Sequence, residues 1–222
     1  PFFAGLLPEG RRLSVLRRAV KTSADDELTL LLAVGHDVIG DVQVLPADGD
    51  APEPPTFARA DLASTTFQAL HAAVLADDPA DRIGLPGVQD KLSGGMIALP
   101  LRWGERPSIL KLAPREFPGV VENEAFFLSL ARQVGLAVPD AEVIEDASGT
   151  TGLLVARFDR VQTDAGWRAR AQEDACQVLG LYPADKYRPS TEEVLAGLAR
   201  ACGAPVVAAR ELLRQVAFSY LI

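Results

Sequence analysis

Apolar side chains recur along the chain at spacings that predict an alternation of helices and strands. Leucines and valines three or four residues apart predict a helix from Arg11 to Val20, with arginines on its opposite face. Acidic residues at 25–27 favour the start of a second helix through Leu32, because the helix dipole attracts negative charge there. Alternating residues from Val38 to Leu45 predict a strand, and four prolines between positions 46 and 55 predict a surface loop. A further helix is expected from Ser64 to Ala76.

The middle of the chain alternates between short apolar runs and turn residues, which is typical of strands. The expected elements are a strand at 96–99, a turn at Gly104, a strand at 108–112, a helix at 120–134, and strands at 141–144 and 153–158 joined by the turn Ser148-Gly149. Beyond residue 160 the pattern is helical. Helices are expected at 172–179, after Ser190 and from 206 to the last residue. Ser190 with Glu193 three residues later forms the capping-box pattern.

Composition and charge limit the classes of protein that remain. The 222 residues are 48% hydrophobic, and no apolar run approaches the ~20 residues that cross a bilayer, so no membrane partner is expected. The net charge of −8 argues against nucleic acid as a direct partner, because phosphate binding needs a basic surface. Cys176 and Cys202 lie far apart and form no Cys-x-x-Cys motif, which argues against structural zinc and favours a reducing cytoplasm.

One charged pair is unusual in the expected sheet. Lys111 interrupts an otherwise apolar strand, and Glu124 follows on the helix expected to pack beside that strand. Burying an ammonium without a partner is costly. In a protein kinase, a strand lysine and a helical glutamate pair in this order, and the lysine holds the nucleotide phosphates. An edge-strand lysine with an exposed helical glutamate is the competing interpretation, and spacing alone does not decide between them.

A glycine-containing turn precedes this strand. Its residues are Gly87-Val88-Gln89-Asp90-Lys91, with Gly94-Gly95 close behind. Glycine lets backbone N–H groups approach phosphate oxygens without a Cβ in the way. The turn is not a Walker A loop, because Gly-x-x-x-x-Gly-Lys is absent. An ordinary hairpin is the default interpretation of such residues.

Taken together, these segments and several others resemble the HipA family of serine/threonine kinase toxins, in the family's order. The segments are Phe2-Phe3-Ala4-Gly5-Leu6-Leu7-Pro8-Glu9-Gly10, Leu85-Pro86-Gly87-Val88-Gln89-Asp90-Lys91-Leu92, Lys111-Leu112-Ala113-Pro114, Glu122-Asn123-Glu124, Gly135-Leu136-Ala137-Val138-Pro139, Arg157-Phe158-Asp159-Arg160, Gln172-Glu173-Asp174-Ala175-Cys176-Gln177 and Lys186-Tyr187. They cover essentially the whole chain, so no single motif has to carry the resemblance.

The resemblance implies a cytoplasmic kinase that binds ATP and Mg²⁺ and phosphorylates a serine of a protein target. In the best-known member that target is an aminoacyl-tRNA synthetase. A helix-turn-helix antitoxin is the implied partner, and it supplies the DNA binding. The nucleotide-contacting residues so implied are Gly87, Val88, Gln89, Asp90, Lys91 and Lys111 at the phosphates, and Val155, Ala156, Arg157 and Phe158 in a hinge around adenine. Glu124 would orient Lys111.

The expected fold class is α+β. It comprises a small N-terminal α/β subdomain at 1–78, a kinase-like N-lobe with a mainly antiparallel sheet and an αC-like helix at 79–160, and helices of an incomplete C-lobe at 161–222. Two positions depart from the family. Gly84 stands where a regulatory serine often precedes the glycine loop, and Ala156 stands where some members have a hinge glutamate.

The residues that perform phosphoryl transfer in kinases are missing from the sequence. That chemistry needs an Asp beside the substrate hydroxyl, an Asn five residues later and a further Asp for Mg²⁺. The single asparagine, Asn123, falls on the expected helix and has Pro118 five residues before it. The chain is therefore expected to be a fragment, cut at both ends and inactive by itself.

Two alternatives belong to other classes. One is a non-catalytic binding module that engages an antitoxin or a partner toxin. The other is a generic nucleotide-binding α/β domain unrelated to kinases, which would be favoured only if Lys111 lay far from Glu124.

Overall fold

The computed structural model describes most of the chain in two compact units. The described residues are 1–23, 25–49, 56–69, 96–113 and 117–222. The larger unit comprises residues 6–127 and 139–172, and the smaller unit comprises residues 1–5, 128–138 and 173–222. The larger unit contains every described residue that the sequence assigns to the nucleotide.

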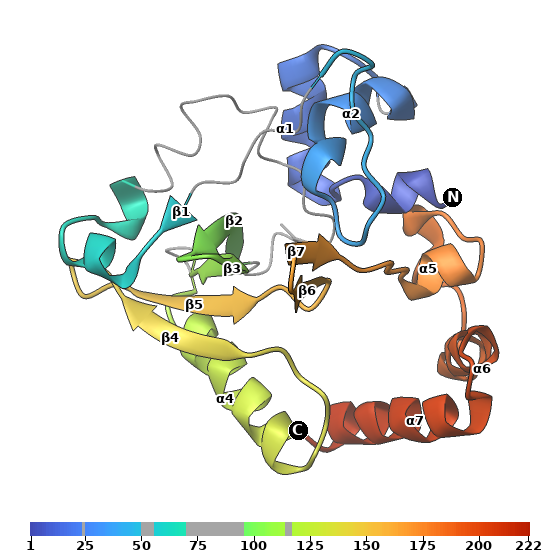
Figure 1. The fold of residues 1–222 in the computed structure, drawn as a ribbon. Coiled ribbons are helices and arrows are strands. Elements are labelled where there is room, and N and C mark those ends of the chain that lie inside the picture. Colours follow the sequence, from blue (N-terminus) through green and yellow to red (C-terminus); the bar gives the residue numbers. More distant parts are fainter. Residues whose placement is uncertain (24, 50–55, 70–95, 114–116) are drawn as a thin grey trace. The chain divides into compact units, whose positions relative to one another are not determined.

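The larger unit is built on a five-stranded sheet with the strand order β1-β2-β3-β5-β4 (Figure 1). Its strands are β1 (Thr56–Phe57), β2 (Ile97–Trp103), β3 (Arg106–Leu112), β4 (Ala141–Glu145) and β5 (Thr151–Ala156). β1 pairs with β2 in parallel, and the other neighbours are antiparallel. Together with the helices below, this sheet confirms the α+β class, whereas the proposed division into three subdomains stays a prediction.

The turn between β2 and β3 sets the position of Lys111. Gly104 in this turn has a φ of 62°, a left-handed conformation that glycine adopts at little cost. From the turn the register continues unbroken to Lys111, which lies opposite Ala98 of β2 and Leu153 of β5. β3 is therefore an interior strand of the sheet.

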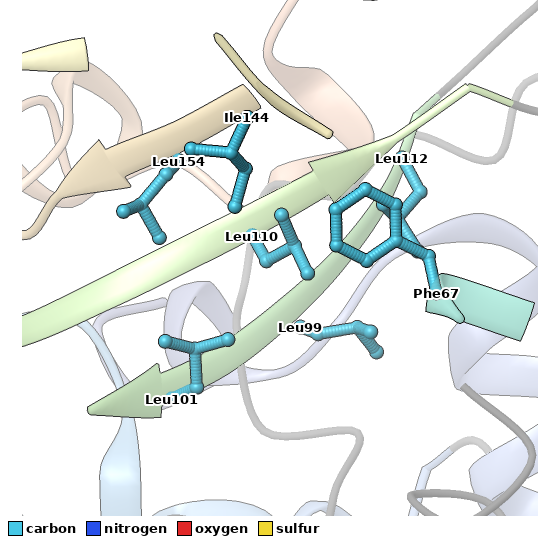
Figure 2. Close-up of a cluster of buried hydrophobic side chains, with 7 residues drawn as sticks. All are labelled: Phe67, Leu99, Leu101, Leu110, Leu112, Ile144 and Leu154. Carbon is cyan, nitrogen blue, oxygen red and sulfur yellow. The ribbon is translucent and has the colours of Figure 1, made fainter. Parts of the chain in front are cut away.

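One face of the sheet carries a hydrophobic core (Figure 2). The buried cluster consists of Phe67, Leu99, Leu101, Leu110, Leu112, Ile144 and Leu154. On β3, Ser108, Leu110 and Leu112 are buried, whereas the residues between them are half-buried. Burying one leucine side chain contributes about 1.5–3 kcal/mol. Because a slip by one residue would turn Lys111 into this core, the hydrophobic pattern fixes the register.

The helix α4 (Val120–Gln133) begins in the larger unit, on the side to which Lys111 points. Val121 in its first turn is fully buried. Its neighbour Glu122 accepts a hydrogen bond of 2.6 Å from the hydroxyl of Thr151, the first residue of β5. The start of α4 is thus fixed to the sheet by one apolar and one polar contact. The helix predicted at 120–134 is confirmed.

Two helices precede the sheet, as the sequence predicts. They are α1 (Gly10–Val20) and α2 (Glu27–Val34). Asp26 caps α2, because its carboxylate accepts the N–H of Thr29 at 3.2 Å. Leu30 and Val34 of α2 are fully buried, so this helix contributes to the interior of the unit.

The strand predicted from Val38 to Leu45 is wrong. After the 3-10 turn η2 (Gly35–Asp37), this stretch forms a loop. The N–H of Val44 donates to the carbonyl of Gly35 at 2.9 Å, and the N–H of Gly40 donates to the carboxylate of Asp159 at 3.0 Å. These two backbone N–H groups therefore find acceptors without a neighbouring strand. The alternation of residues in the sequence does not show where such acceptors lie.

Some elements of the larger unit were not predicted. They are the 3-10 helix η3 (Arg59–Ala63) and a two-stranded hairpin of β6 (Arg160–Thr163) and β7 (Gly166–Ala169). The short β1 was missed as well. Of the helix expected at 64–76, only residues up to 69 are described, and 67–69 are helical.

The smaller unit is mainly helical. Its elements are η1 (Phe3–Leu6, which starts in this unit), the end of α4, α5 (Ala175–Val178), η4 (Pro183–Asp185), α6 (Thr191–Ala201) and α7 (Pro205–Leu221). Ser190 and Glu193 cap α6 reciprocally, with bonds of 3.2 and 2.7 Å, as the capping-box pattern predicts. The helix expected at 172–179 starts only at residue 175, because Asp174 acts as its N-cap. None of the described helices is long and apolar enough to span a bilayer.

Candidate functional site

The lysine and the glutamate singled out by the sequence meet in the structure. Lys111 Nζ lies 2.6 Å from Glu124 Oε1, and each side chain is 29% exposed. β3 points Lys111 away from the core around Leu110. Glu124 follows the buried Val121 by about one helical turn, so the packing of α4 directs its carboxylate toward the strand. The interpretation as an edge-strand lysine with an exposed helical glutamate is wrong, because β3 is an interior strand and Glu124 is half-buried.

The pair matters more for position than for stability. An ion pair with this much solvent contact contributes about 0–1 kcal/mol. A lysine ammonium has three N–H donors, and Glu124 is the one hydrogen-bond partner of Lys111 among the residues that the structure describes. Glu124 therefore holds the ammonium in place while leaving it donors for an anion such as a phosphate.

Glu122 adds a second fixed point to the same helix. Its hydrogen bond from Thr151 lowers the pKa of its carboxyl below the ordinary value. Glu122 and Glu124 thus bind different strands, β5 and β3. Two anchors two residues apart restrain rotation of α4, and this restraint keeps Glu124 within reach of Lys111.

The predicted hinge offers a ligand an open backbone position at Phe158. Val155 and Ala156 end β5, and Arg157 and Phe158 follow it. The N–H groups of Ala156 and Arg157 donate to backbone carbonyls within the unit, at 2.8 and 3.1 Å. Phe158 makes no hydrogen bond with any described residue, and the residue is 56% exposed. Its backbone N–H and C=O groups are therefore available to bond to the edge of a planar base.

The side chain of Arg157 belongs to a buried cluster of two arginines and two aspartates. Arg157 Nη1 lies 2.7 Å from both carboxylate oxygens of Asp37, and its Nε and Nη2 donate to Asp159 at 3.0 and 2.7 Å. Arg160 bridges the same carboxylates at 2.8 and 2.6 Å. The Arg157 and Asp159 side chains are each only 3% exposed.

We refer to Asp37, Arg157, Asp159 and Arg160 as the ion cluster, and backbone carbonyls complete its hydrogen bonds. Arg157 Nη2 and Arg160 Nη1 donate to the carbonyls of residues 38 and 40, each at 3.0 Å. All donor nitrogens of the Arg157 guanidinium therefore have an acceptor. The cluster joins the loop at 37–40 to the segment at 157–160, which lie far apart in the sequence.

The pKa values in the cluster follow from opposing effects. Burial by itself lowers the pKa of Arg157 and raises that of Asp159, because it disfavours charge. The hydrogen bonds and charge of Asp159 and Asp37 outweigh burial and raise the pKa of Arg157 above its ordinary value. In return, Arg157 and the Gly40 N–H lower the pKa of Asp159. Both side chains are therefore charged at neutral pH.

A cavity of about 290 Å³ lies beside the ion cluster. Its lining includes Asp37, Arg102, Ser108, Arg157, Arg160 and Trp167. Lys111 and Glu124 do not line this cavity. It is thus separate from the place where the sequence predicts the nucleotide phosphates.

The expected phosphate loop, Gly87–Lys91, lies outside the described residues. Across the described part of the chain, no three His, Cys, Asp or Glu side chains gather as metal ligands would.

The ion cluster was not predicted from the sequence. Its signal was the run of three charged residues in Arg157-Phe158-Asp159-Arg160, directly after an apolar strand.

The sheet and the pair together define a kinase-like class of protein. A lysine on an interior strand of a mainly antiparallel sheet, paired with a glutamate of the adjacent helix, is the arrangement of a protein-kinase N-lobe. Two family models match the sequence: the HipA N-terminal domain over residues 1–45 and the HipA-like C-terminal domain over residues 83–222. The chain belongs to the HipA family.

Individual relatives agree with this family. The putative kinases Y4mE and Y4dM of Sinorhizobium fredii are 34% and 32% identical to the chain over its full length. The match covers 57% and 54% of those proteins, so the chain spans slightly more than half of their length.

A solved structure matches the fold. It is that of the HipA, HipB and operator DNA complex of the toxin–antitoxin system of Shewanella oneidensis MR-1. The match has a TM-score of 0.70 and 21% identity, and it covers 98% of this chain and 55% of the matched chain.

Proposed function

We propose that this chain is the nucleotide-binding part of a HipA-type protein serine/threonine kinase, which transfers the γ-phosphoryl group of ATP to a serine of a protein target. The observation that carries the proposal is the 2.6 Å contact between Lys111 and Glu124. Membership of the HipA family and the two relatives named as putative kinases support it.

In this proposal Lys111 binds the α- and β-phosphates of ATP. Its ammonium is a compact charge, and holding the polyphosphate in a fixed position is a large part of what a kinase contributes to phosphoryl transfer. Glu124 keeps the ammonium at that position in the absence of nucleotide. The loop Gly87–Lys91 would add backbone N–H donors to the phosphates, and the backbone of Phe158 would bind the adenine edge.

The transfer step needs residues that these 222 positions do not supply. A catalytic Asp with an Asn five residues later is absent, and the single asparagine, Asn123, lies on α4. In kinases the same Asn and a further Asp bind Mg²⁺. We therefore infer that the 222 residues alone bind ATP without transferring phosphate.

The partners follow from the family in the same way. The matched structure contains HipA together with HipB and operator DNA. We infer that a helix-turn-helix antitoxin binds this protein as well and carries the DNA contact, because the net charge of −8 is unsuited to direct DNA binding. From the family resemblance alone we further propose that the protein substrate is an aminoacyl-tRNA synthetase and that the reaction takes place in the cytoplasm.

Calorimetric titration of the chain with ATP tests the nucleotide site. Removing a charged hydrogen bond costs about 1.5–3 kcal/mol, so Lys111→Ala should weaken ATP binding roughly 10- to 100-fold. Arg106→Ala is the matched control, since it removes a cation from the same strand at an exposed ion pair. Equal ATP affinity in the Lys111→Ala variant and the unmodified chain would reject the proposal.

Incubation of the 222 residues with ATP, Mg²⁺ and a target protein tests the inferred lack of phosphoryl transfer. Serine phosphorylation of the target by the 222 residues would disprove that inference.

A further inference from the structure

The ion cluster connects two parts of the family's architecture. Asp37 lies within the stretch matched by the HipA N-terminal domain, residues 1–45, whereas Arg157, Asp159 and Arg160 lie within the HipA-like C-terminal domain. Asp37 contacts both arginines through its carboxylate, at 2.7 and 2.8 Å. A side chain of the N-terminal domain therefore holds the segment that directly follows β5.

This connection fixes the backbone around Phe158. Arg157 precedes it and Asp159 follows it, and both of these side chains are almost completely buried in the cluster. Phe158 itself is exposed and its backbone is open. A residue between two immobilised neighbours has little freedom of φ and ψ, so the direction of its N–H and C=O groups depends on the cluster.

The charges of the cluster balance in the folded protein, with two arginines against two aspartates. Neutralising Asp37 would leave two guanidinium groups with Asp159 alone, in an environment where unpaired charge is expensive. Arg157 Nη1 and Arg160 Nη2, the two nitrogens that donate to Asp37, would then lose their charged acceptor. The segment at 157–160 would shift or loosen, and the backbone of Phe158 would lose its fixed direction.

We propose that Asp37 is a positioning residue for the nucleotide site, through which the N-terminal HipA domain sets the affinity and selectivity for the adenine base. This inference rests on the proposed function, because it takes the segment at 155–158 to be the adenine hinge. Asp37 is expected to affect binding of the adenine base and not binding of the phosphates. Lys111 would bind the phosphates independently of Asp37, since it stands on β3 and pairs with α4.

Titrations of the intact protein with ATP, GTP and inorganic tripolyphosphate distinguish binding of the base from binding of the phosphates. Asp37→Asn is expected to weaken ATP binding roughly 2- to 30-fold, the range of known positioning effects at a distance. It should reduce the preference for ATP over GTP and leave the affinity for tripolyphosphate unchanged. Asp41→Asn is the matched control, because Asp41 is an exposed aspartate of the same loop. Asp37→Glu, which retains the carboxylate, should restore part of the ATP preference.

The outcomes distinguish this inference from the proposed function. If Lys111→Ala leaves ATP and tripolyphosphate binding unchanged, the proposed function fails. If Lys111→Ala weakens both and Asp37→Asn weakens neither or weakens both equally, only the role of Asp37 in base positioning is overturned.

A second measurement covers the case in which Asp37→Asn does not fold. In the unmodified protein, saturating ATP should slow hydrogen exchange at the Gly40 N–H, which donates to Asp159. This follows because two coupled sites stabilise each other reciprocally. Tripolyphosphate should not slow it. Identical exchange at Gly40 with and without ATP would overturn the inference.

Discussion

Replacement of Arg157 by methionine tests whether the ion cluster holds the larger unit together. The guanidinium is 3% exposed and donates to Asp37, Asp159 and the carbonyl of Val38. Methionine fills much of the same space but donates no hydrogen bond. The variant would leave the buried carboxylate of Asp159 with Arg160 as its remaining cation in the cluster.

The expected cost follows from this burial. Removing one partner of a buried ion pair typically costs about 3–5 kcal/mol, and here two carboxylates would be left with one cation, Arg160. For a protein of this size, each kcal/mol lowers the melting temperature by roughly 2–4 °C, so Arg157→Met should lower it by about 6–20 °C. Arg106→Met is the control. Arg106 pairs with Asp140 at the same 2.7 Å, but these side chains are 47% and 67% exposed, and the expected cost is about 0–1 kcal/mol.

Tryptophan fluorescence during urea unfolding is the suitable assay. Both tryptophans, Trp103 and Trp167, lie in the larger unit, so the signal reports the unit that contains the cluster. A free energy of unfolding for Arg157→Met within 1 kcal/mol of that for Arg106→Met would refute the reasoning. It would mean that water or rearranged side chains replace the guanidinium at little cost.

Two further predictions concern stability. Leu110→Ala should lower the free energy of unfolding by about 2–5 kcal/mol, because Leu110 is 1% exposed in the sheet core. Leu213→Ala, at a 56% exposed position of α7, is the control and should change this free energy by less than about 0.5 kcal/mol. Denaturant titrations measure both values. The pKa of Asp159 is lowered in the folded state, so its stabilising contribution is complete above its unfolded-state pKa of about 4 and is lost as pH falls below it. The difference in unfolding free energy between the unmodified protein and Asp159→Asn should therefore shrink from about pH 6 to about pH 3. A difference that stays constant over this range would contradict the assigned pKa direction.

Local patterns predicted the regular elements well where the local signal is strong. The helix α6 begins where Ser190 and Glu193 indicate, because a capping box is formed by side chains three residues apart. The strands β3 and β5 and the helix α4 follow from apolar periodicity. The loop after η2 was misread as a strand, since Gly40 donates to a carboxylate 119 residues away and no local pattern records such a bond.

In the candidate site, too, some residues could be selected from the sequence and others could not. Lys111 and Glu124 could be selected from the sequence, because a charged residue in an apolar strand requires a partner and the next helix offers one. The partner of Arg157 could not be selected. Nothing near Asp37 in the sequence distinguishes it from the other acidic residues, and only the fold brings its carboxylate within 2.7 Å of the guanidinium.

The amino-acid sequence alone therefore determined the family, the helices and strands with strong periodicity, and a lysine and glutamate suited to a nucleotide site. These depend on neighbours along the chain or on motifs in a fixed order. The tertiary structure decided that Lys111 and Glu124 are in contact, that Phe158 has an open backbone, and that Asp37 holds the segment around it. Such contacts arise where distant segments pack together, and their geometry is set by burial and charge balance in the folded molecule.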